Sequence, residues 1–337
     1  MLFGYAGKFL WVDLTQGTLQ EEVPPPDLLR DFVGGYGVGA KILYDNMQPG
    51  VDPLGPENIL GVLTGPLTGT TAPTATRWTV VAKSPLTGGW GDANGSGFFG
   101  VAMKKSGFDA VFFTGISEKP VYLYLEDGHY ELRDASELWG LDTYETEDWI
   151  KETLGKDVEG ICIGPSGEKL SLIAGILHSK GRAAARSGLG AVMGSKRLKM
   201  IAARGSLDFP VADKEREKIA RKTYMKEIND GVGASNFYRE TGTPGILTWT
   251  IHMADVPVKN WGASVEEFPD PDPLEYSELM THRKKRQACY RCAIACWGTS
   301  ELEYDGRKVT AHQPEFQTSA AFGCLTLNND YPSLITA

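Results

Sequence analysis

The sequence predicts an α+β protein in which a β-sheet-rich N-terminal domain precedes a mainly α-helical domain. Between residues 7 and 208, short apolar and β-branched runs alternate with glycine and proline turns, as the strands of a sheet do. From residue 210 onward, apolar residues recur with the period of a helix and charged residues fill the remaining faces. We therefore expect one domain over residues 1–209 and a second over residues 210–337.

At least eight strands are expected in the first domain. They are the runs at residues 9–15, 57–65, 77–84, 110–116, 121–127, 160–165, 170–177 and 199–205. Two helices interrupt them, because residues 25–35 begin after prolines and end in glycine, and residues 145–155 open with acidic residues and close with glycine. Strands in this number, interrupted by helices, predict a mixed α and β class.

After residues 208–222 the pattern changes to helical periodicity, which runs through residues 224–231 and 273–288. The acidic, proline-bearing piece at residues 266–273 is typical of a loop that leads into a cluster of cysteines. The sequence ends in a segment with the composition of a globular domain, without a capping glycine or a polar tail. We therefore expect the protein to continue beyond Ala337.

The composition favours a soluble metabolic protein. The 337 residues are 42% hydrophobic, which is enough for one large core or two. A net charge of -9 supplies no surplus of Lys and Arg for nucleic acid or an anionic membrane. The chain has no apolar run of about 18 residues and no secretory leader at its start, so we expect a cytoplasmic protein without a membrane span.

Three of the five cysteines lie close together, as Cys289, Cys292 and Cys296 in the spacing C-x2-C-x3-C. A disulfide framework does not cluster its cysteines in this way. Thiolates on one short segment can bind three corners of a 4Fe-4S cubane and leave the fourth corner to a distant residue. The neighbouring basic residues, at 283–286 and 291, favour thiolates over neutral thiols.

Zinc and plain structural cysteines are the alternatives to an iron-sulfur cluster. A structural zinc site would need a second Cys/His pair, and the sequence offers only the lone His282 and His312. Within this chain the fourth cluster ligand would be Cys162 or Cys324, although each is more often a buried thiol of the core.

Glycine-rich runs occur at residues 33–41, 86–100 and 181–196. Glycine lets backbone N–H groups approach an anionic ligand, although such runs also form tight turns. The first run fits G-x-G-x-x-A through Gly35 and Gly37, but it follows a helical segment where a dinucleotide fingerprint requires a strand, so we do not expect NAD.

The third glycine-rich run pairs arginines with small residues. Arg182 and Arg186 flank three alanines just before a glycine-rich stretch. Guanidinium groups beside small residues suit a phosphate or a planar pterin that packs closely on the backbone. No nucleotide P-loop pattern occurs anywhere in the chain.

Taken together, these segments resemble the aldehyde ferredoxin oxidoreductase family. The matching motifs follow one another in order along nearly the whole chain, at residues 4–17, 32–43, 63–70, 76–100, 182–205, 242–247, 256–261 and 289–298. The resemblance implies that residues 1–209 form a base of packed sheets for a tungsten or molybdenum bis-pterin cofactor. It also implies that residues 210–337 are part of a helical domain that carries the iron-sulfur cysteines.

The resemblance assigns particular residues to the cofactor. The pterin-binding set is Arg77, Asn94, Gly95, Ser96, Arg182, Ala183, Ala185 and Arg186. Arg77 would contact a pterin phosphate, and magnesium would bridge the phosphates. Ser96 and Ala185 stand where relatives commonly have glycine, and the methyl group of Ala185 requires a negative φ there.

The resemblance also makes Cys289, Cys292 and Cys296 the first three cluster ligands. The fourth ligand and a partner histidine would lie beyond Ala337. Glu315 matches the glutamate near the metal that would orient a water or the substrate carbonyl. Gln317 stands where the family often has a second glutamate.

The function implied is oxidation of an aldehyde and water to a carboxylate. Electrons would pass through the 4Fe-4S cluster to ferredoxin or to an iron-sulfur electron-transfer subunit, and a homo-oligomer is left open. One alternative is a catalytic subunit like that of class II benzoyl-CoA reductases, which carry a cysteine at the position of Glu315. The other is a non-catalytic iron-sulfur or zinc-binding module. Tungsten and molybdenum use the same dithiolene ligands, so the sequence fits both.

Overall fold

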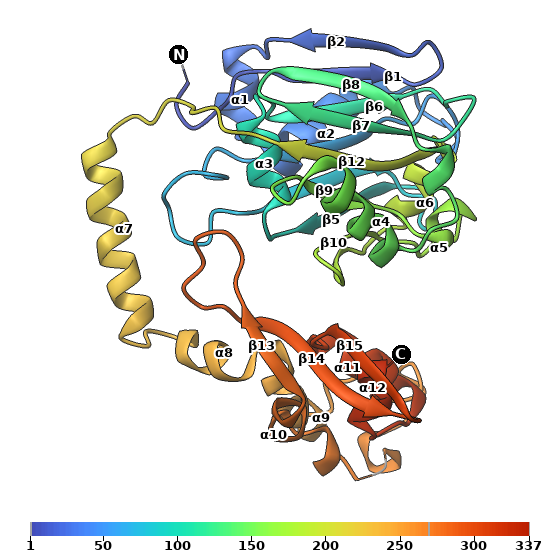
Figure 1. Ribbon diagram of the computed structural model, residues 1–337, viewed down its shortest axis with the longest axis vertical. Coiled ribbons are helices and arrows are strands. Elements are labelled where there is room, and N and C mark those ends of the chain that lie inside the picture. The colour runs from blue at the N-terminus through green and yellow to red at the C-terminus, as the bar shows by residue number, and fades with distance from the viewer. Residues whose placement is uncertain (1, 269, 337) are drawn as a thin grey trace. The chain divides into compact units, whose positions relative to one another are not determined.

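The computed structural model describes residues 2–268 and 270–336 and divides the chain into two compact units (Figure 1). Unit 1 is Met1–Lys218 and unit 2 is Ile219–Ala337. Unit 1 holds two six-stranded sheets with helices between and outside them, and unit 2 holds helices and a three-stranded sheet. The fold is therefore α+β, with a sheet-rich N-terminal region as the sequence predicts.

The first sheet of unit 1 has the strand order β2-β1-β6-β3-β4-β5. Its strands are β1 (Phe9–Asp13), β2 (Thr18–Glu22), β3 (Leu60–Thr64), β4 (Trp78–Lys83), β5 (Trp90–Gly95) and β6 (Ala110–Thr114). Only the β1–β6 pair is parallel, and the other neighbours are antiparallel. The edges of this sheet are therefore β2 and β5.

The second sheet has the strand order β11-β10-β9-β12-β7-β8. Its strands are β7 (Val121–Glu126), β8 (His129–Asp134), β9 (Glu159–Cys162), β10 (Ile176–His178), β11 (Arg182–Ala184) and β12 (Leu198–Arg204). Strands β7 and β12 run parallel, and the remaining pairs are antiparallel. The short strand β11 forms one edge.

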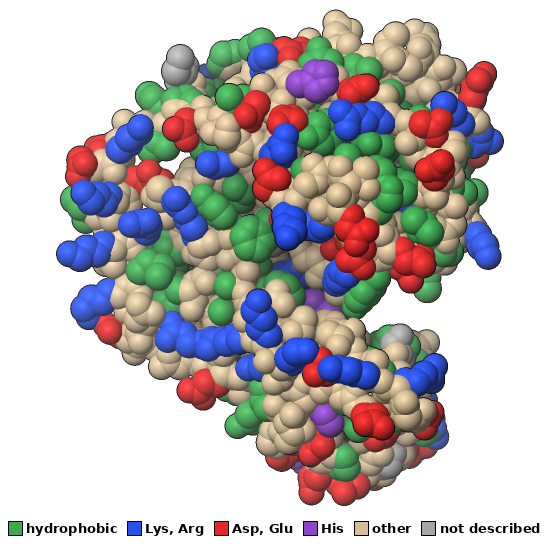
Figure 2. Space-filling view, viewed as in Figure 1, with side chains coloured by type: hydrophobic (Ala, Val, Ile, Leu, Met, Phe, Trp, Pro, Cys, Tyr) green, Lys and Arg blue, Asp and Glu red, His purple; other side chains and the backbone are tan. Residues whose placement is uncertain are grey.

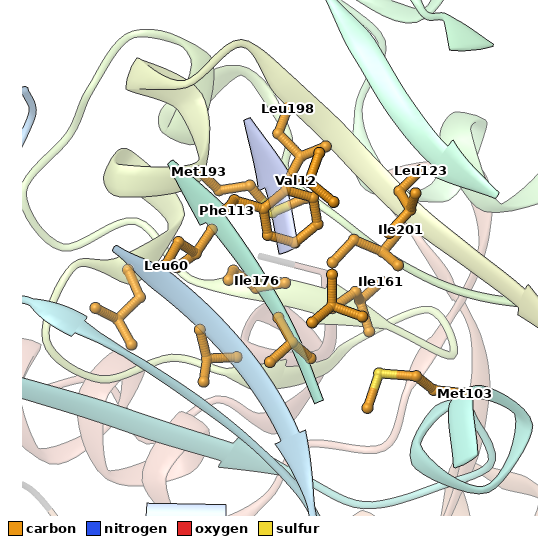
Figure 3. Packing of buried hydrophobic residues seen from close by; sticks show 14 of the residues in the cluster. Val12, Leu60, Met103, Phe113, Leu123, Ile161, Ile176, Met193, Leu198 and Ile201 are labelled. Atoms are coloured by element: carbon orange, nitrogen blue, oxygen red, sulfur yellow. The ribbon is translucent and has the colours of Figure 1, made fainter. Parts of the chain in front are cut away.

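The two sheets share one hydrophobic core, and Figure 3 shows side chains from both sheets meeting in it. Alternate residues of β1 and β6 point inward, among them Val12 and Phe113, while Phe9 and Phe112 point to the opposite face. In the second sheet, Ile201 of β12 enters the same core. This alternation follows from the two-residue period of a strand, and it buries both faces of both sheets.

Helices complete the packing of unit 1. They are α1 (Pro26–Phe32), α2 (Gly35–Asn46), α3 (Phe99–Lys105), α4 (Thr143–Trp149), α5 (Pro165–Glu168) and α6 (Leu189–Ser195), and a π-helical turn (Ile150–Leu154) continues α4. Helix α2 packs on β3 and β4, and α4 packs on β9. Helices α3 and α6 contribute to the core that the sheets share.

Unit 2 contains a small core of its own, built around Leu247, Leu274 and Tyr331. Its helices are α8 (Ser235–Thr241), α9 (Leu247–His252), α10 (Tyr276–Thr281), α11 (Phe316–Phe322) and α12 (Tyr331–Thr336). Its antiparallel sheet has the order β13-β14-β15, with β13 (Arg283–Gln287), β14 (Trp297–Tyr304) and β15 (Arg307–His312).

Helix α7 (Lys214–Asn229) spans the boundary between the two units. Ile228 is its one buried residue, and Figure 2 shows Lys and Arg side chains along the exposed surface of this helix. A helix that is polar on nearly every side is stabilised by solvent and by its own ion pairs, such as Lys226 with Asp230, more than by a core.

Most predicted strands are present, but two predictions are wrong in detail. Residues 170–175 form turns, and only β10 follows them, because Leu170 has a positive φ of 59° that ends extended structure. The helix predicted through residue 288 stops at Thr281, and residues 283–287 form strand β13. Pairing with β14 decides the conformation of that basic segment.

Four strands of unit 1 carried no strand prediction, namely β2, β5, β8 and β11. Helix α2 lies in the first glycine-rich run and directly follows α1, so the absence of a preceding strand agrees with the exclusion of a dinucleotide fingerprint.

In the described residues, 2–268 and 270–336, no helix is long and apolar enough to cross a bilayer.

A buried ion pair joins β12 to α5 in unit 1. Lys199 Nζ lies 2.6 Å from Glu168 Oε1 and 2.8 Å from the carbonyl oxygen of Leu141, and the side chains of Lys199 and Glu168 are 0% and 6% exposed. The Glu168 carboxylate also accepts the N–H of Gly140. Removing one member of such a pair leaves an uncompensated buried charge.

We expect Glu168→Ala to lower the free energy of unfolding by about 3–5 kcal/mol, measured by urea denaturation of the 337-residue chain. The matched control is Glu21→Ala, which removes an ion pair of the same 2.6 Å length with Lys8 at a more exposed place. That change should cost under ~1 kcal/mol. Equal effects of the two substitutions would contradict the importance given to burial.

Candidate functional site

Apart from Arg77, the predicted pterin-binding residues fall into a first loop, residues 94–96, and a second loop, residues 182–186. The first loop lies at the end of the β4–β5 pair. Arg77 directly precedes β4, and Asn94 and Gly95 end β5, where Trp78 is the register partner of Gly95. The Arg77 guanidinium donates to Asn94 Oδ1, and Asn94 Nδ2 donates to the Tyr36 hydroxyl at 2.5 Å. These contacts place Tyr36, at the start of α2, beside Arg77 and Asn94.

Gly95 is required at its position by the neighbouring indole. A Cβ at residue 95 would lie 2.5 Å from Cζ2 of Trp78, so any larger residue would displace the buried tryptophan. Trp78 Nε1 in turn donates to the Ser96 carbonyl oxygen at 3.2 Å. The backbone of this loop is therefore held close to the sheet, because glycine lets the indole pack directly against it.

The second loop begins on β11 and reaches the first one directly. Arg182 Nη1 donates to Ser96 Oγ at 2.5 Å. Ser187 Oγ donates to the Asp92 carbonyl oxygen at 3.1 Å, and the Asp92 N–H donates to Ser187 Oγ at 3.3 Å. Ser96, at a position where the resemblance implies glycine, thus joins the second loop to the first, and the Ser187–Asp92 pair adds a second connection.

The remaining residues of the second loop face solvent. Ala183, Ala185 and Arg186 are exposed, and the φ of Ala185 is negative, so its methyl group fits the backbone there. In the part of the chain that the structure describes, neither Arg77 nor Arg186 has an ion-pair partner. Two guanidinium groups beside glycine-rich backbone, without a carboxylate to neutralise them, suit a phosphate-bearing ligand.

A cavity of about 510 Å³ lies beside Arg77. It is lined by residues 33–36, 63–68 and 73–77 together with Thr79. Thr76 belongs to this lining, is buried, and has a hydroxyl without a hydrogen-bond partner. A cavity of this size can enclose a group as large as a pterin.

Buried Lys104 fixes the wall of this cavity. Its ammonium donates to the carbonyl oxygens of Gly65 at 2.7 Å and Pro66 at 3.3 Å, and Asp109 lies 3.9 Å away. Burial lowers the pKa of Lys104 to about 8, and the Asp109 carboxylate opposes that change. The turn that forms the wall is therefore held by a cation that is itself inside the protein.

In unit 2 the three clustered cysteines lie on the loop between β13 and β14. Cys289, Cys292 and Cys296 are all half-buried. The Cys292 N–H donates to the Cys289 carbonyl oxygen at 3.1 Å, and Arg286 donates to the carbonyl oxygens of Ile294 at 2.6 Å and Ala295 at 2.9 Å. Arg286 of β13 therefore holds the loop that carries the three cysteines in a folded shape.

The thiols fit an iron-sulfur cluster by donor chemistry, since three soft ligands lie on eight residues of one loop. Within residues 2–268 and 270–336, no three His, Cys, Asp or Glu side chains surround a common ion position. The other two cysteines belong to apolar cores, where burial raises the pKa of Cys162 far above its usual value and that of Cys324 to about 11.

Glu315 lies next to the cysteine loop through a shared turn. It directly precedes α11, and its carboxylate accepts the hydroxyl of Thr243, which in turn accepts the Phe316 N–H at 2.9 Å. A Cβ on the neighbouring Gly242 would lie 2.6 Å from the Cys296 carbonyl oxygen. One glycine-threonine turn therefore touches both the glutamate and the loop of the thiols.

The two histidines considered as zinc ligands have other contacts. His282, directly after α10, has its Nε2 3.6 Å from Glu278 of that helix, and His312 stacks on Trp297 with ring centroids 4.9 Å apart. Sequence reasoning gave no role to Tyr36 or Thr243, although both stand inside recognised motifs. Their roles depend on a hydrogen-bond partner distant in sequence, which a motif does not name.

Two family models match consecutive parts of the chain. The N-terminal domain of aldehyde ferredoxin oxidoreductase matches residues 9–205, and domains 2 and 3 of aldehyde ferredoxin oxidoreductase match residues 219–337. Tungsten-containing aldehyde ferredoxin oxidoreductases are similar over 100% of this chain and 55% of their own length. That of Pyrococcus furiosus is 37% identical, and that of Thermococcus kodakarensis is 38% identical.

Two further relatives have names that refer to compounds other than aldehydes. The WOR-like subunit of an aliphatic sulfonate oxidoreductase of Pyrococcus furiosus is 34% identical over 96% of this chain and 54% of its own. The BamBC complex of benzoyl-coenzyme A reductase, solved with 1,5-dienoyl-CoA, has a TM-score of 0.84 and 28% identity over 100% of this chain and 52% of that one. The chain spans about half the length of the curated relatives it matches. It belongs to the aldehyde ferredoxin oxidoreductase family.

Proposed function

We propose that this chain forms the cofactor-binding part of a tungsten-pterin oxidoreductase that oxidises an aldehyde to a carboxylate and reduces ferredoxin. The observation that carries the proposal is the joining of two loops, because Arg182 contacts Ser96 and Arg77 contacts Asn94. These residues are far apart in sequence, yet they form one cationic rim on unit 1. A phosphate-bearing pterin is the ligand that such a rim and the adjacent cavity fit.

Each part of the rim has a role toward the pterin. Arg77, Arg182 and Arg186 would neutralise its phosphates, with magnesium as a bridging cation. The backbone at Asn94, Gly95 and Ser96 and at Ala183 and Ala185 would pack against the ring system. When bound, the pterin-held metal supplies two-electron redox chemistry, and molybdenum would fit the same ligands.

In unit 2, Cys289, Cys292 and Cys296 would hold three corners of a 4Fe-4S cluster, which takes up electrons one at a time. Glu315 would orient a water or the substrate carbonyl as a candidate catalytic residue. Its carboxylate is held by Thr243, so its direction is set before a substrate enters. We assign Thr243 a positioning role.

Glu315 supports an aldehyde as the substrate class. A carboxylate can accept a proton from water as the carbonyl carbon becomes a carboxylate carbon. Benzoyl-CoA reductases of this family resemble the chain elsewhere but carry a cysteine at this position. The BamBC and sulfonate oxidoreductase relatives nevertheless make an aromatic thioester and an aliphatic sulfonate the two substrates to compare with aldehydes.

Elemental analysis of the anaerobically purified enzyme tests the proposal. We expect tungsten, or molybdenum, beside about four irons from this cluster for each copy of the chain. Zinc alone would support a non-catalytic binding module instead. A panel of aldehydes, benzoyl-CoA and an aliphatic sulfonate with a viologen acceptor then identifies the substrate, and turnover of benzoyl-CoA without any aldehyde would replace the proposed reaction.

Alanine at Cys292 tests the cluster ligands. We expect Cys292→Ala to abolish the visible absorbance and the reduced-state paramagnetic signal of the 4Fe-4S cluster, because one corner loses its thiolate. The circular dichroism of the sheets should be unchanged, since Cys292 lies in a loop. Cys162→Ala is the matched control and should keep the cluster. A full cluster spectrum in the Cys292 variant would show that the assignment is wrong.

Substitution of Thr243 tests the positioning of Glu315. Thr243→Val keeps the shape of the side chain and removes the hydroxyl, so we expect kcat for an aldehyde to fall by roughly 10-fold or more with KM little changed, as for the loss of a hydrogen bond to a charged group. Thr243→Ser keeps the hydroxyl and should retain most activity. Equal losses in both variants, or a rise in KM alone, would argue against this role.

A further inference from the structure

A strained turn connects β10 to β11 and carries the second cofactor loop. His178 and Arg182 are register partners across this hairpin, and the three residues between them have positive φ values, 49° at Ser179, 51° at Lys180 and 128° at Gly181. Two of those three are not glycine. Left-handed backbone at such residues costs free energy and persists only where surrounding contacts hold it.

Helix α4, which lies against β10, supplies those contacts (Figure 1). The Glu147 carboxylate accepts the N–H of Lys180 at 2.9 and 3.0 Å. The Tyr144 hydroxyl donates to the carbonyl oxygen of Lys180 at 3.0 Å, and Asp148 pairs with the ammonium of Lys180. One residue of the turn is therefore held at its N–H, its carbonyl and its side chain by a single helix.

The helix itself has a fixed N-terminus. Asp142 and Glu145 form a capping box in which the Asp142 side chain accepts the Glu145 N–H at 2.8 Å and the Glu145 side chain accepts the Asp142 N–H at 2.9 Å. Such a cap removes unsatisfied N–H groups from the first turn and resists fraying. The residues that hold Lys180 thus project from an anchored element.

Glu147 is an unusual residue for the interior. It is 8% exposed, and burial raises its pKa to about 7, while the Lys180 N–H opposes that rise. A carboxyl group in such a place destabilises the fold unless it has a specific partner. The partner is the strained peptide of the cofactor hairpin.

The other end of the hairpin reaches the first cofactor loop. His178 is buried, with its ring edge-to-face against Trp78 at a centroid distance of 5.5 Å, and a Cβ on Gly97 would lie 2.8 Å from its Cε1. Arg182 contacts Ser96. A shift of the turn at Lys180 would therefore move the arginine that joins the two loops.

We propose that α4 is the positioning element of the second cofactor loop, in which Glu147 and Tyr144 hold the Lys180 peptide so that Arg182 is in place before the pterin binds. This inference rests on the proposed assignment of residues 182–186 to the pterin. Glu147 and Tyr144 touch no cofactor themselves. They act through the turn.

The first test measures the hairpin without cofactor. Amide hydrogen exchange at residues 178–184 of the 337-residue chain should be roughly 10- to 100-fold faster in Glu147→Ala, as for the loss of a hydrogen bond to a charged group. Glu147→Gln keeps a carbonyl oxygen for the Lys180 N–H and should restore most of the protection. Glu152→Ala, on the exposed continuation of the same helix, is the control and should match the wild type.

The second test measures the cofactor content of the holoenzyme. We expect Glu147→Ala to lower tungsten per chain by roughly 10-fold while the iron of the cluster, bound by unit 2, stays the same. Unchanged exchange and unchanged tungsten in Glu147→Ala would overturn the proposal. Loss of iron and tungsten together, with Glu147→Gln no better, would also overturn it by showing a merely structural residue.

A second variant and a separate readout distinguish the possible outcomes. If Glu147→Ala does not fold, Tyr144→Phe removes only the hydroxyl that donates to Lys180, and faster exchange confined to residues 178–184 is the supporting result. Unaltered exchange in that variant would oppose the inference. A wild-type enzyme with neither tungsten nor molybdenum would defeat the proposed function, whereas the exchange measurement would still decide whether α4 holds the hairpin.

Discussion

Contact between two edge strands, β5 of the first sheet and β11 of the second, is the constraint on which the candidate cofactor site depends. The two sheets stack through one core, to which β5 contributes Ala93 and β11 contributes Ala184. Small residues at these two positions let the edge strands approach each other. Because they do, Ser96 after β5 accepts a hydrogen bond from Arg182 on β11, and Ser187 after β11 donates one to the Asp92 carbonyl oxygen on β5.

The edge position of these strands also bears on which cations are exposed and which are buried. An edge strand has one side without a partner strand, so its backbone and the loop beyond it can face a ligand. Arg186 extends from the loop beyond the edge strand β11, and Arg77 directly precedes β4, the neighbour of the edge strand β5. Neither has a carboxylate partner in the described residues, whereas Lys104 and Lys199 are buried and bonded to oxygen atoms of the protein. The buried cations shape the scaffold, and the exposed ones are left for an anionic ligand.

Burial decides which parts of this fold could be predicted from the sequence. Central strands such as β3, β6 and β12 are buried on both faces, so their apolar runs predicted them directly. Edge strands β2, β8 and β13 are rich in charged and polar residues, four of the six residues of β5 are glycine, aspartate or asparagine, and β11 has only three residues. Their conformation comes from pairing with a neighbour, which the local sequence does not encode.

The residues of the candidate site divide in the same way, into those that the local sequence indicates and those that it does not. Arg77, Asn94, Arg182 and the three clustered cysteines were indicated by residue type and family resemblance, because those features are local. Tyr36, Glu147 and Thr243 were not, because each acts through a partner from 33 to 72 positions away.

Such residues share one physical property: each holds a backbone peptide, a side-chain amide or a carboxylate in a direction that the group would not keep alone. A cofactor site built on edge strands lacks a sheet partner on one side, so the rigidity that a partner strand would supply must come from these side chains.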